Sequence, residues 1–167
     1  MASNANFISQ FVMGGDPCTY KESGELQAEM SKLTHPARPD VDWRQVEKLC
    51  LALFRQNGVE LQTLVCYVLA ITRRQGLAGM ADGLGSLDIL LQRWADFWPV
   101  QVHSRISLLS WVTEKMQQAL RTLDIQYQDL PQIYRCVQHL SAIETTLQQC
   151  ELWHMTKLDL LAGQFRN

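Results

Sequence analysis

The stretch that decides the fold reads Gly76-Leu77-Ala78-Gly79-Met80-Ala81-Asp82-Gly83-Leu84, and it follows a long apolar segment. Three glycines, Gly76, Gly79 and Gly83, fall within eight residues. Because glycine adopts backbone conformations closed to other residues, the cluster predicts a tight corner that ends one helix and opens the next. It lacks the Gly-Lys-Ser/Thr ending of a phosphate-binding loop and follows no strand, so we interpret it as an inter-helical turn.

Helical periodicity extends to both sides of this corner. Asp42 followed by Gln45 predicts a capped helix start, and residues 60–75 are apolar over most of a helix circumference, as in a central buried helix. A third stripe follows the corner and ends at Pro99. It comprises Leu84, Leu87, Leu90, Leu91, Trp94 and Trp98.

Further helices are predicted before and after these three. Residues 19–33 suggest a short acidic helix, Ser104 can cap a fourth long helix, and Pro131 stands in the first turn of a fifth. Residues 151–162 extend the fifth helix or form a short final one. Since the connections are short and contain Gly or Pro, the sequence predicts an all-α antiparallel bundle of about six helices.

Composition excludes several classes of function. The net charge of −2 and the scattered cations, with Arg73-Arg74 as the one doublet, argue against nucleic-acid binding. The longest apolar run, residues 64–71, is far shorter than the roughly 20 residues of a membrane span. Five cysteines without a disulfide spacing and a start without a secretory leader indicate a reducing compartment. We therefore expect a cytoplasmic chain.

The sequence gives little indication of a metal site or of catalysis. Cys136 with His139 and Cys150 with His154 each share a helix face, but the two pairs would lie roughly 20 Å apart on one continuous helix. The carboxylates considered for acid–base chemistry lie near helix ends or on polar faces and have no predicted histidine or serine partner. They are Asp82, Asp88 and Asp96. We expect no catalytic residue, no metal and no cofactor.

The tryptophans and glutamines leave two interpretations open. The tryptophans fit core or core-edge positions, although one or two could be exposed interface anchors. They are Trp43, Trp94, Trp98, Trp111 and Trp153. The glutamines of the last third fit either a solvated surface or helix–helix contacts with a partner. They are Gln117, Gln118, Gln126, Gln128, Gln132, Gln138, Gln148 and Gln149.

The order of these motifs over residues 14–112 resembles the ImpA-type N-terminal domain of TssA-like proteins of bacterial type VI secretion systems. We interpret the residues that carry the resemblance as builders of the domain, and no partner contact is assigned to them. They are Pro17, Asp42, Trp43, Val46, Leu61, Gly76, Leu77, Gly79, Gly83, Leu84, Trp94, Pro99, Arg105 and Trp111.

One departure from the family pattern bears on the branch. Many members have a helix start similar to Ser-Lys-Asp-Leu, where this chain has Asn57-Gly58-Val59-Glu60-Leu61. The resemblance therefore favours the accessory TagA or VasL type, associated with the distal end of the sheath, over core TssA, which primes baseplate and tube assembly. A generic helical adaptor outside secretion and a metal-dependent helical enzyme are the remaining alternatives.

The sequence pattern predicts an organisation of the chain, and the resemblance implies a set of partners. Residues 1–17 form an irregular arm, residues 18–125 the ImpA-like helical domain, and residues 126–167 a helical extension packed on it. Further regions, including a membrane segment, would follow in a longer protein associated with the inner membrane. The implied partners are sheath, tube or baseplate proteins, or other copies of the chain.

Overall fold

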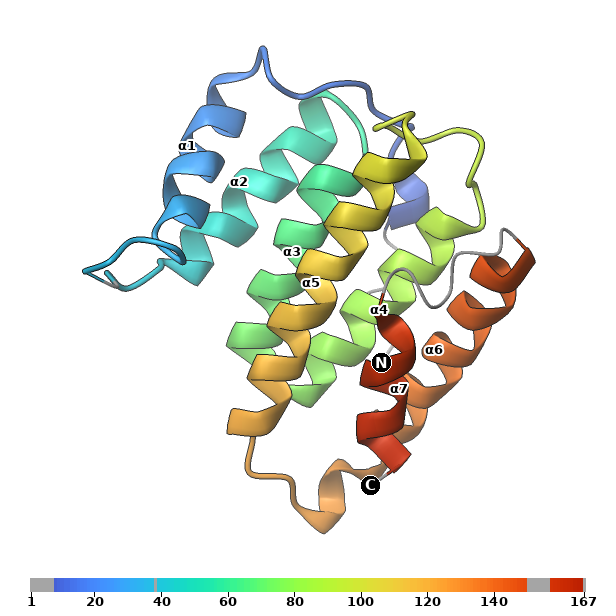
Figure 1. The fold of residues 1–167 in the computed structure, drawn as a ribbon. Coiled ribbons are helices and arrows are strands. Elements are labelled where there is room, and N and C mark those ends of the chain that lie inside the picture. The colour runs from blue at the N-terminus through green and yellow to red at the C-terminus, as the bar shows by residue number, and fades with distance from the viewer. Residues whose placement is uncertain (1–7, 38, 150–156, 167) are drawn as a thin grey trace.

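The computed structural model describes residues 8–37, 39–149 and 157–166, which form helices and turns without a strand (Figure 1). The all-α prediction is therefore confirmed, with seven α-helices in these ranges where about six were expected. The helices are α1 (Lys21–Ser31), α2 (Trp43–Gln56), α3 (Leu61–Gln75), α4 (Leu77–Leu91), α5 (Val102–Thr122), α6 (Leu130–Gln149) and α7 (Leu158–Arg166). A short 3-10 turn, η2 (Tyr127–Asp129), precedes α6.

Helix α3 is the centre of the bundle and packs against α2, α4 and α5 (Figure 1). Its residues are buried from Leu61 to Thr72 except for Gln62, which confirms the prediction of a central helix. The preceding helix α2 begins as predicted, because the Asp42 side chain accepts a hydrogen bond of 3.1 Å from the Gln45 amide. Gly76 ends α3 with a φ of +64°, a conformation that favours glycine.

The other two glycines of the cluster do not form a corner, and this part of the prediction is wrong. Gly79 and Gly83 lie inside α4 and face α3. A Cβ at Gly79 would overlap the carbonyl of Ile71, and one at Gly83 would lie 2.7 Å from the Cγ1 of Val68. The spacing of four residues places both glycines on one helix face, so they let the two helices approach closely.

The predicted third stripe is also too long. Helix α4 ends at Leu91, and Trp94 and Trp98 lie in the connection between α4 and α5, both half-buried. Trp94 packs edge-on against buried Phe97, with ring centroids 5.6 Å apart. Helix α5 begins at Val102, two residues before Ser104, so Ser104 is not its cap.

The described part of the predicted arm, residues 8–17, begins with a 3-10 turn at residues 8–10, is otherwise irregular and lies against the helices. Ile8 is buried in the core. The Val59 amide donates to the Val12 carbonyl and the Gly14 amide to the Val59 carbonyl, each at 2.8 Å. Gly58, with a φ of +102°, leaves room for this backbone, because a Cβ there would lie 2.5 Å from the Val12 oxygen.

The last two helices extend the same core. Helix α6 packs on α4, and α7 packs on α5 and α6 (Figure 1). Their core-facing residues are Cys136, Leu140, Ile143, Leu147, Leu158 and Leu161. Cys150, Trp153 and His154 lie outside the described residues. None of the helices in the described ranges has the length and apolarity needed to cross a bilayer.

Candidate docking surface

Arg105 organises the connection between α4 and α5. Although charged, it is only 4% exposed. Its guanidinium donates to the carbonyl oxygens of Pro99 at 2.6 Å, of Phe97 at 2.5 Å and of Trp94, and it lies 4.0 Å from the Phe97 ring centroid. A planar group with five donors suits such a set of acceptors. The only role these contacts indicate for Arg105 is to hold the connection in place.

The carboxylates of α4 join it to α6. Asp82, which is 8% exposed, forms an ion pair with Arg135. Asp88 Oδ2 lies 3.6 Å from His139 Nδ1. Asp96, in the following connection, pairs instead with Arg93 at 3.4 Å. The three carboxylates singled out for acid–base chemistry therefore each have a cation or histidine partner, and the structure does not bring them together.

Glu60 is the most perturbed acid in the described chain. Its Oε1 caps α3 by accepting from the Thr63 amide at 3.0 Å, whereas Oε2 is buried without a hydrogen-bond partner. Burial raises the pKa of the Glu60 carboxyl to about 7. Burial also raises the pKa of the nearby Cys66 thiol to about 12, which keeps this sulfur protonated and unreactive. These groups offer no nucleophile beside a base.

Cys136 and His139, the pair on α6 that was weighed as half of a metal site, point in different directions. Cys136 points into the core and burial raises the pKa of its thiol to about 12, whereas His139 lies at the edge against Asp88. No group of three or more potential ligands comes together among the residues that the structure describes.

The motif residues are mostly internal. Asp42 is exposed at the helix cap, and the half-buried members are Trp43, Gly76, Trp94 and Trp111. The buried members are Pro17, Val46, Leu61, Leu77, Gly79, Gly83, Leu84, Pro99 and Arg105. The Leu61 amide also donates to the Trp98 carbonyl at 2.9 Å, which joins the start of α3 to the Trp94–Pro99 segment. These residues occupy two regions, the helix interfaces and the connection held by Arg105.

A family model described as ImpA, N-terminal, type VI secretion system, matches residues 8–114, well over half of the chain. The chain belongs to this family. No curated protein and no solved structure matches the chain significantly. The resemblance stated for residues 14–112 is thus confirmed at the level of the family. The match ends inside α5, and α6 and α7 lie beyond it.

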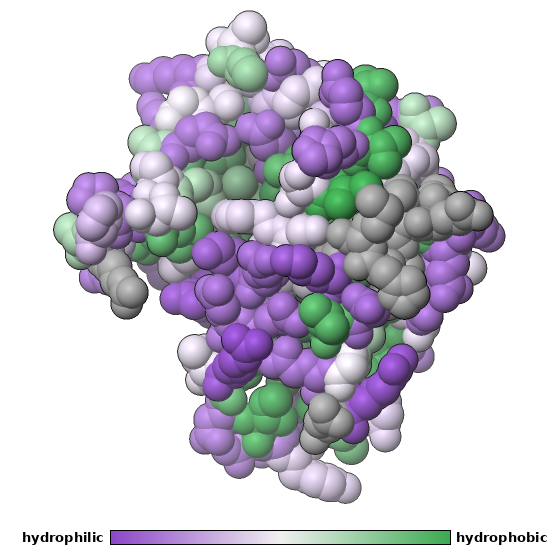
Figure 2. Space-filling model, viewed as in Figure 1, coloured by the Kyte–Doolittle hydropathy of each residue, from purple (hydrophilic) through white to green (hydrophobic). Residues whose placement is uncertain are grey.

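Two concave surfaces of the ImpA domain stand out among the residues that the structure describes. The first, which we call the α1/α5 groove, has a volume of about 430 Å³ and continues at Gln62, Ser107 and Leu108 into a hollow of about 330 Å³ beside Trp98. Figure 2 shows apolar surface recessed between α1 and α5. Its lining carries no charged side chain and is more apolar than polar, and it consists of Gln27, Met30, Ser31, Gln62, Val65, Cys66, Ser107, Leu108 and Trp111.

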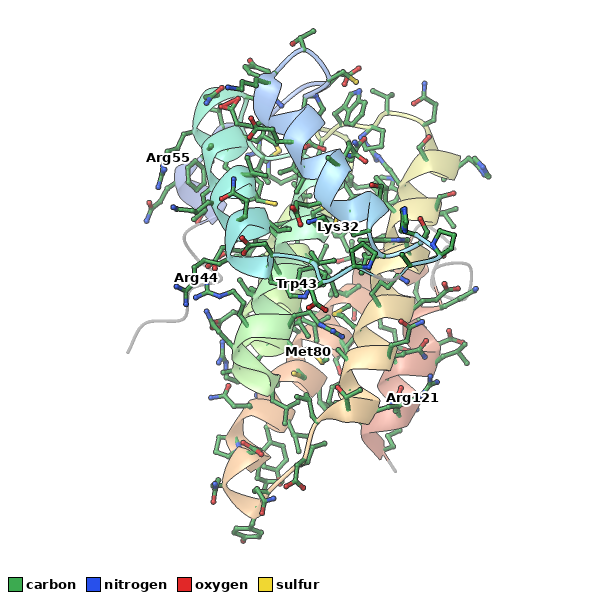
Figure 3. The ribbon with its side chains drawn as sticks, turned by 90° about the vertical axis from the view of Figure 1, so that its left-hand side faces the viewer. Lys32, Trp43, Arg44, Arg55, Met80 and Arg121 are labelled. Atoms are coloured by element: carbon green, nitrogen blue, oxygen red, sulfur yellow. The ribbon has the colours of Figure 1, made fainter. Side chains whose placement is uncertain are left out.

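The second concavity, which we call the basic pocket, has a volume of about 690 Å³. It lies between the 32–43 connection and the faces of α3 and α5, and in Figure 3 Lys32 and Trp43 lie together at the middle of this side. Its lining consists of Lys32, Leu33, Pro39, Asp40, Val41, Trp43, Leu69, Arg73, Lys115 and Gln118.

Sequence reasoning missed both concavities. In the sequence the Arg73-Arg74 doublet is only an isolated pair of cations, and the structure shows what each of them contacts. Arg74 pairs with Glu47, and the Arg73 guanidinium lies over the Trp43 ring, 5.6 Å from its centroid. The basic doublet was the one signal in the sequence, because the nearness of Trp43 depends on the packing of α2 against α3 and that of Lys115 on the packing of α3 against α5.

Proposed function

We propose that this ImpA domain is a non-enzymatic docking module that binds protein components of a type VI secretion system in the bacterial cytoplasm. The family match over residues 8–114 carries the proposal. The contacts of the site support it, because buried Arg105 and the α4 carboxylates are occupied in holding the helices and their connection together. The four described cysteines are free thiols, as is usual in a reducing compartment.

We further propose the accessory TagA or VasL type of role, in which the module holds or terminates the growing sheath. The support is the segment before α3, which reads Asn57-Gly58-Val59 and departs from the Ser-Lys-Asp-Leu-like start of many family members, keeping only an acidic residue and a leucine as Glu60 and Leu61. A rigid helical bundle suits docking on a growing end, since little conformational entropy is lost on binding. The core TssA role, which engages baseplate and tube, is the alternative.

The test is capture of purified sheath, tube and baseplate proteins by the immobilised 167-residue chain. We expect sheath protein to be retained in preference to tube and baseplate. Retention of baseplate and tube would favour the core role, and retention of none by a chain that is folded by circular dichroism would contradict docking. Elemental analysis of the same sample is expected to find less than one metal ion per chain, and a stoichiometric metal would favour the enzyme alternative.

A further inference from the structure

The basic pocket brings cations from three separate segments to one hollow whose lining is part polar and part apolar. Lys32 follows α1, Arg73 belongs to the last turn of α3, and Lys115 lies in the middle of α5. Asp40 is the one carboxylate among the lining residues. Side chains so far apart in sequence converge here only because α1, α3 and α5 pack together.

The charges of the pocket are unevenly neutralised. Lys32 is paired with Glu29 at 2.8 Å, so this side of the pocket is close to neutral. Within the described part of the chain, neither Arg73 nor Lys115 has an ion pair with a carboxylate. The wall formed by α3 and α5 therefore presents two cations that a ligand carboxylate could reach.

The remaining lining selects against a small anion and against nucleic acid. Trp43, Val41 and Leu69 give the pocket an apolar surface, and about 690 Å³ lies within the range of roughly 300–1,000 Å³ typical of pockets that enclose whole organic groups. Phosphate alone would leave this surface unused. Nucleic acid requires a longer basic stripe than these three cations provide, and the chain as a whole carries a net charge of −2.

We propose that the basic pocket binds an acidic segment of a partner protein in which carboxylates flank an apolar side chain. The carboxylates would pair with Arg73 and Lys115, and the apolar side chain would pack against Trp43. Arginine pairs with a carboxylate through two parallel hydrogen bonds, which fixes the direction of the bound segment. The inference rests on the proposed function only in that the domain docks other proteins.

The probe is a blocked peptide, EELEELEE, added to the full 167-residue chain labelled with 15N for NMR. We expect it to shift the indole N–H signal of Trp43 and to leave that of Trp111, in the α1/α5 groove, unchanged. The amide analogue QQLQQLQQ is expected to bind at least about tenfold more weakly, because it lacks the charges that pair with Arg73 and Lys115. Added salt is expected to weaken binding of the acidic peptide.

Three variants of equal charge change locate the site. Arg73→Glu and Lys115→Glu are each expected to weaken binding at least about tenfold, since each reverses a cation of the pocket. Arg55→Glu is the matched control, because Arg55 is exposed near the other end of α2, away from Lys32 and Trp43 (Figure 3). We expect this control to change the affinity less than about twofold, because a distant exposed charge is screened by salt.

Several outcomes would overturn the pocket assignment. They are equal binding of the two peptides, a signal change centred on Trp111, an equal loss of binding in Arg55→Glu, or no shift at millimolar peptide. Displacement of the peptide by inorganic phosphate at matched ionic strength would instead indicate a small-anion site. If sheath protein is captured but the peptide does not bind, this inference alone is rejected. If the peptide binds but sheath protein is not captured, the proposed secretion partner is rejected.

Discussion

At the scale of single residues, Arg105 holds more of the structure together than any exposed ion pair does. Its guanidinium satisfies three carbonyl oxygens in a buried place, and hydrogen bonds to a charged group contribute about 1.5–3 kcal/mol each. We predict that Arg105→Met lowers the free energy of unfolding by at least about 3 kcal/mol, because the carbonyls lose their donor. Urea denaturation followed by circular dichroism measures the change.

Arg93→Met is the matched control for this substitution. Arg93 lies in the same connection, but it pairs with Asp96 where both side chains are about half exposed. Exposed pairs contribute little, so the control is expected to lower stability by less than about 1 kcal/mol. Similar losses in the two variants would contradict the role assigned to Arg105.

Glu60 gives the molecule a dependence on pH near neutrality. Its pKa in the folded chain is about 7, above the ordinary value of 4.5, so the folded state binds the proton more tightly than the unfolded state does. The resulting stability is fully present below pH 4.5 and is lost as the pH rises through about 7. We predict that the wild type loses about 3 kcal/mol relative to Glu60→Gln over this range.

The comparison requires urea denaturation of both proteins at mildly acidic and mildly alkaline pH. Glutamine retains an oxygen that can accept from the Thr63 amide but cannot ionise, so the other titrating groups cancel in the difference. Parallel stability profiles for the two proteins would show that Glu60 titrates as an ordinary carboxylate.

At the scale of elements, the contact between α3 and α4 depends on the absence of two side chains. We predict that Gly79→Ala destabilises the fold by about 2 kcal/mol or more, because its Cβ would meet the main chain of Ile71, which cannot rotate away. Gly24→Ala is the control. A Cβ there meets nothing within 4 Å on exposed α1, so this variant is expected to gain up to about 1 kcal/mol from helix propensity.

Thermal denaturation of the two alanine variants beside the wild type measures both effects. The two variants make the same chemical change but are expected to change stability in opposite directions. The comparison therefore separates the effect of packing from that of helix propensity. A stabilised Gly79→Ala would mean that α4 can move away from α3 at little cost, which would remove the reason given for its glycines.

The helices could be predicted from periodicity, and two of the errors have a common cause, because contacts distant in sequence override the local signal. Gly79 and Gly83 were assigned to a turn because glycine is a poor helix former, but close packing against Val68 and Ile71 decides their conformation. The stripe was continued through Trp94 because aromatic spacing remained helical. Hydrogen bonds from Arg105 to carbonyl oxygens stabilise a non-helical backbone at Trp94 and the residues after it. The spacing of apolar residues in the sequence does not reveal these bonds.

At the scale of the whole molecule, α6 and α7 complete the core of the family domain. Helix α4 is buried on nearly all sides, by α3 on one face and by α6 on another. We predict that a chain ending at residue 125 has a melting temperature at least about 10 °C lower, because it exposes this face and leaves Asp82 without Arg135. Differential scanning calorimetry measures the shift.

A chain ending at residue 149 provides the graded control. It retains α6 and the Asp82–Arg135 pair and loses only α7, whose buried residues are Leu158 and Leu161. We expect a smaller decrease than for the shorter chain. Equal melting temperatures for the full chain and the chain ending at 125 would make residues 1–125 an independent folding unit.

The candidate site was less predictable than the fold, because each of its parts combines residues distant in sequence. The pairing of Asp82 with Arg135 spans 53 positions, and the basic pocket combines Lys32 with Lys115. The sequence contains many scattered charged residues, and their charge alone does not indicate which of them lie together in the folded chain. The residues that carry the family pattern could be recognised because most of them pack inside the fold. They identify the family, but they do not indicate which surface binds a partner.

The manner in which Arg105 holds the α4–α5 connection has an evolutionary consequence. Its hydrogen bonds end on main-chain oxygens, which every amino acid supplies. Outward-facing positions such as Val100, which is 73% exposed, can therefore be exchanged without loosening the anchor. The exposed side chains of the α4–α5 connection could therefore change during evolution while its backbone shape is kept. Related proteins could then acquire new binding specificities by a few surface mutations.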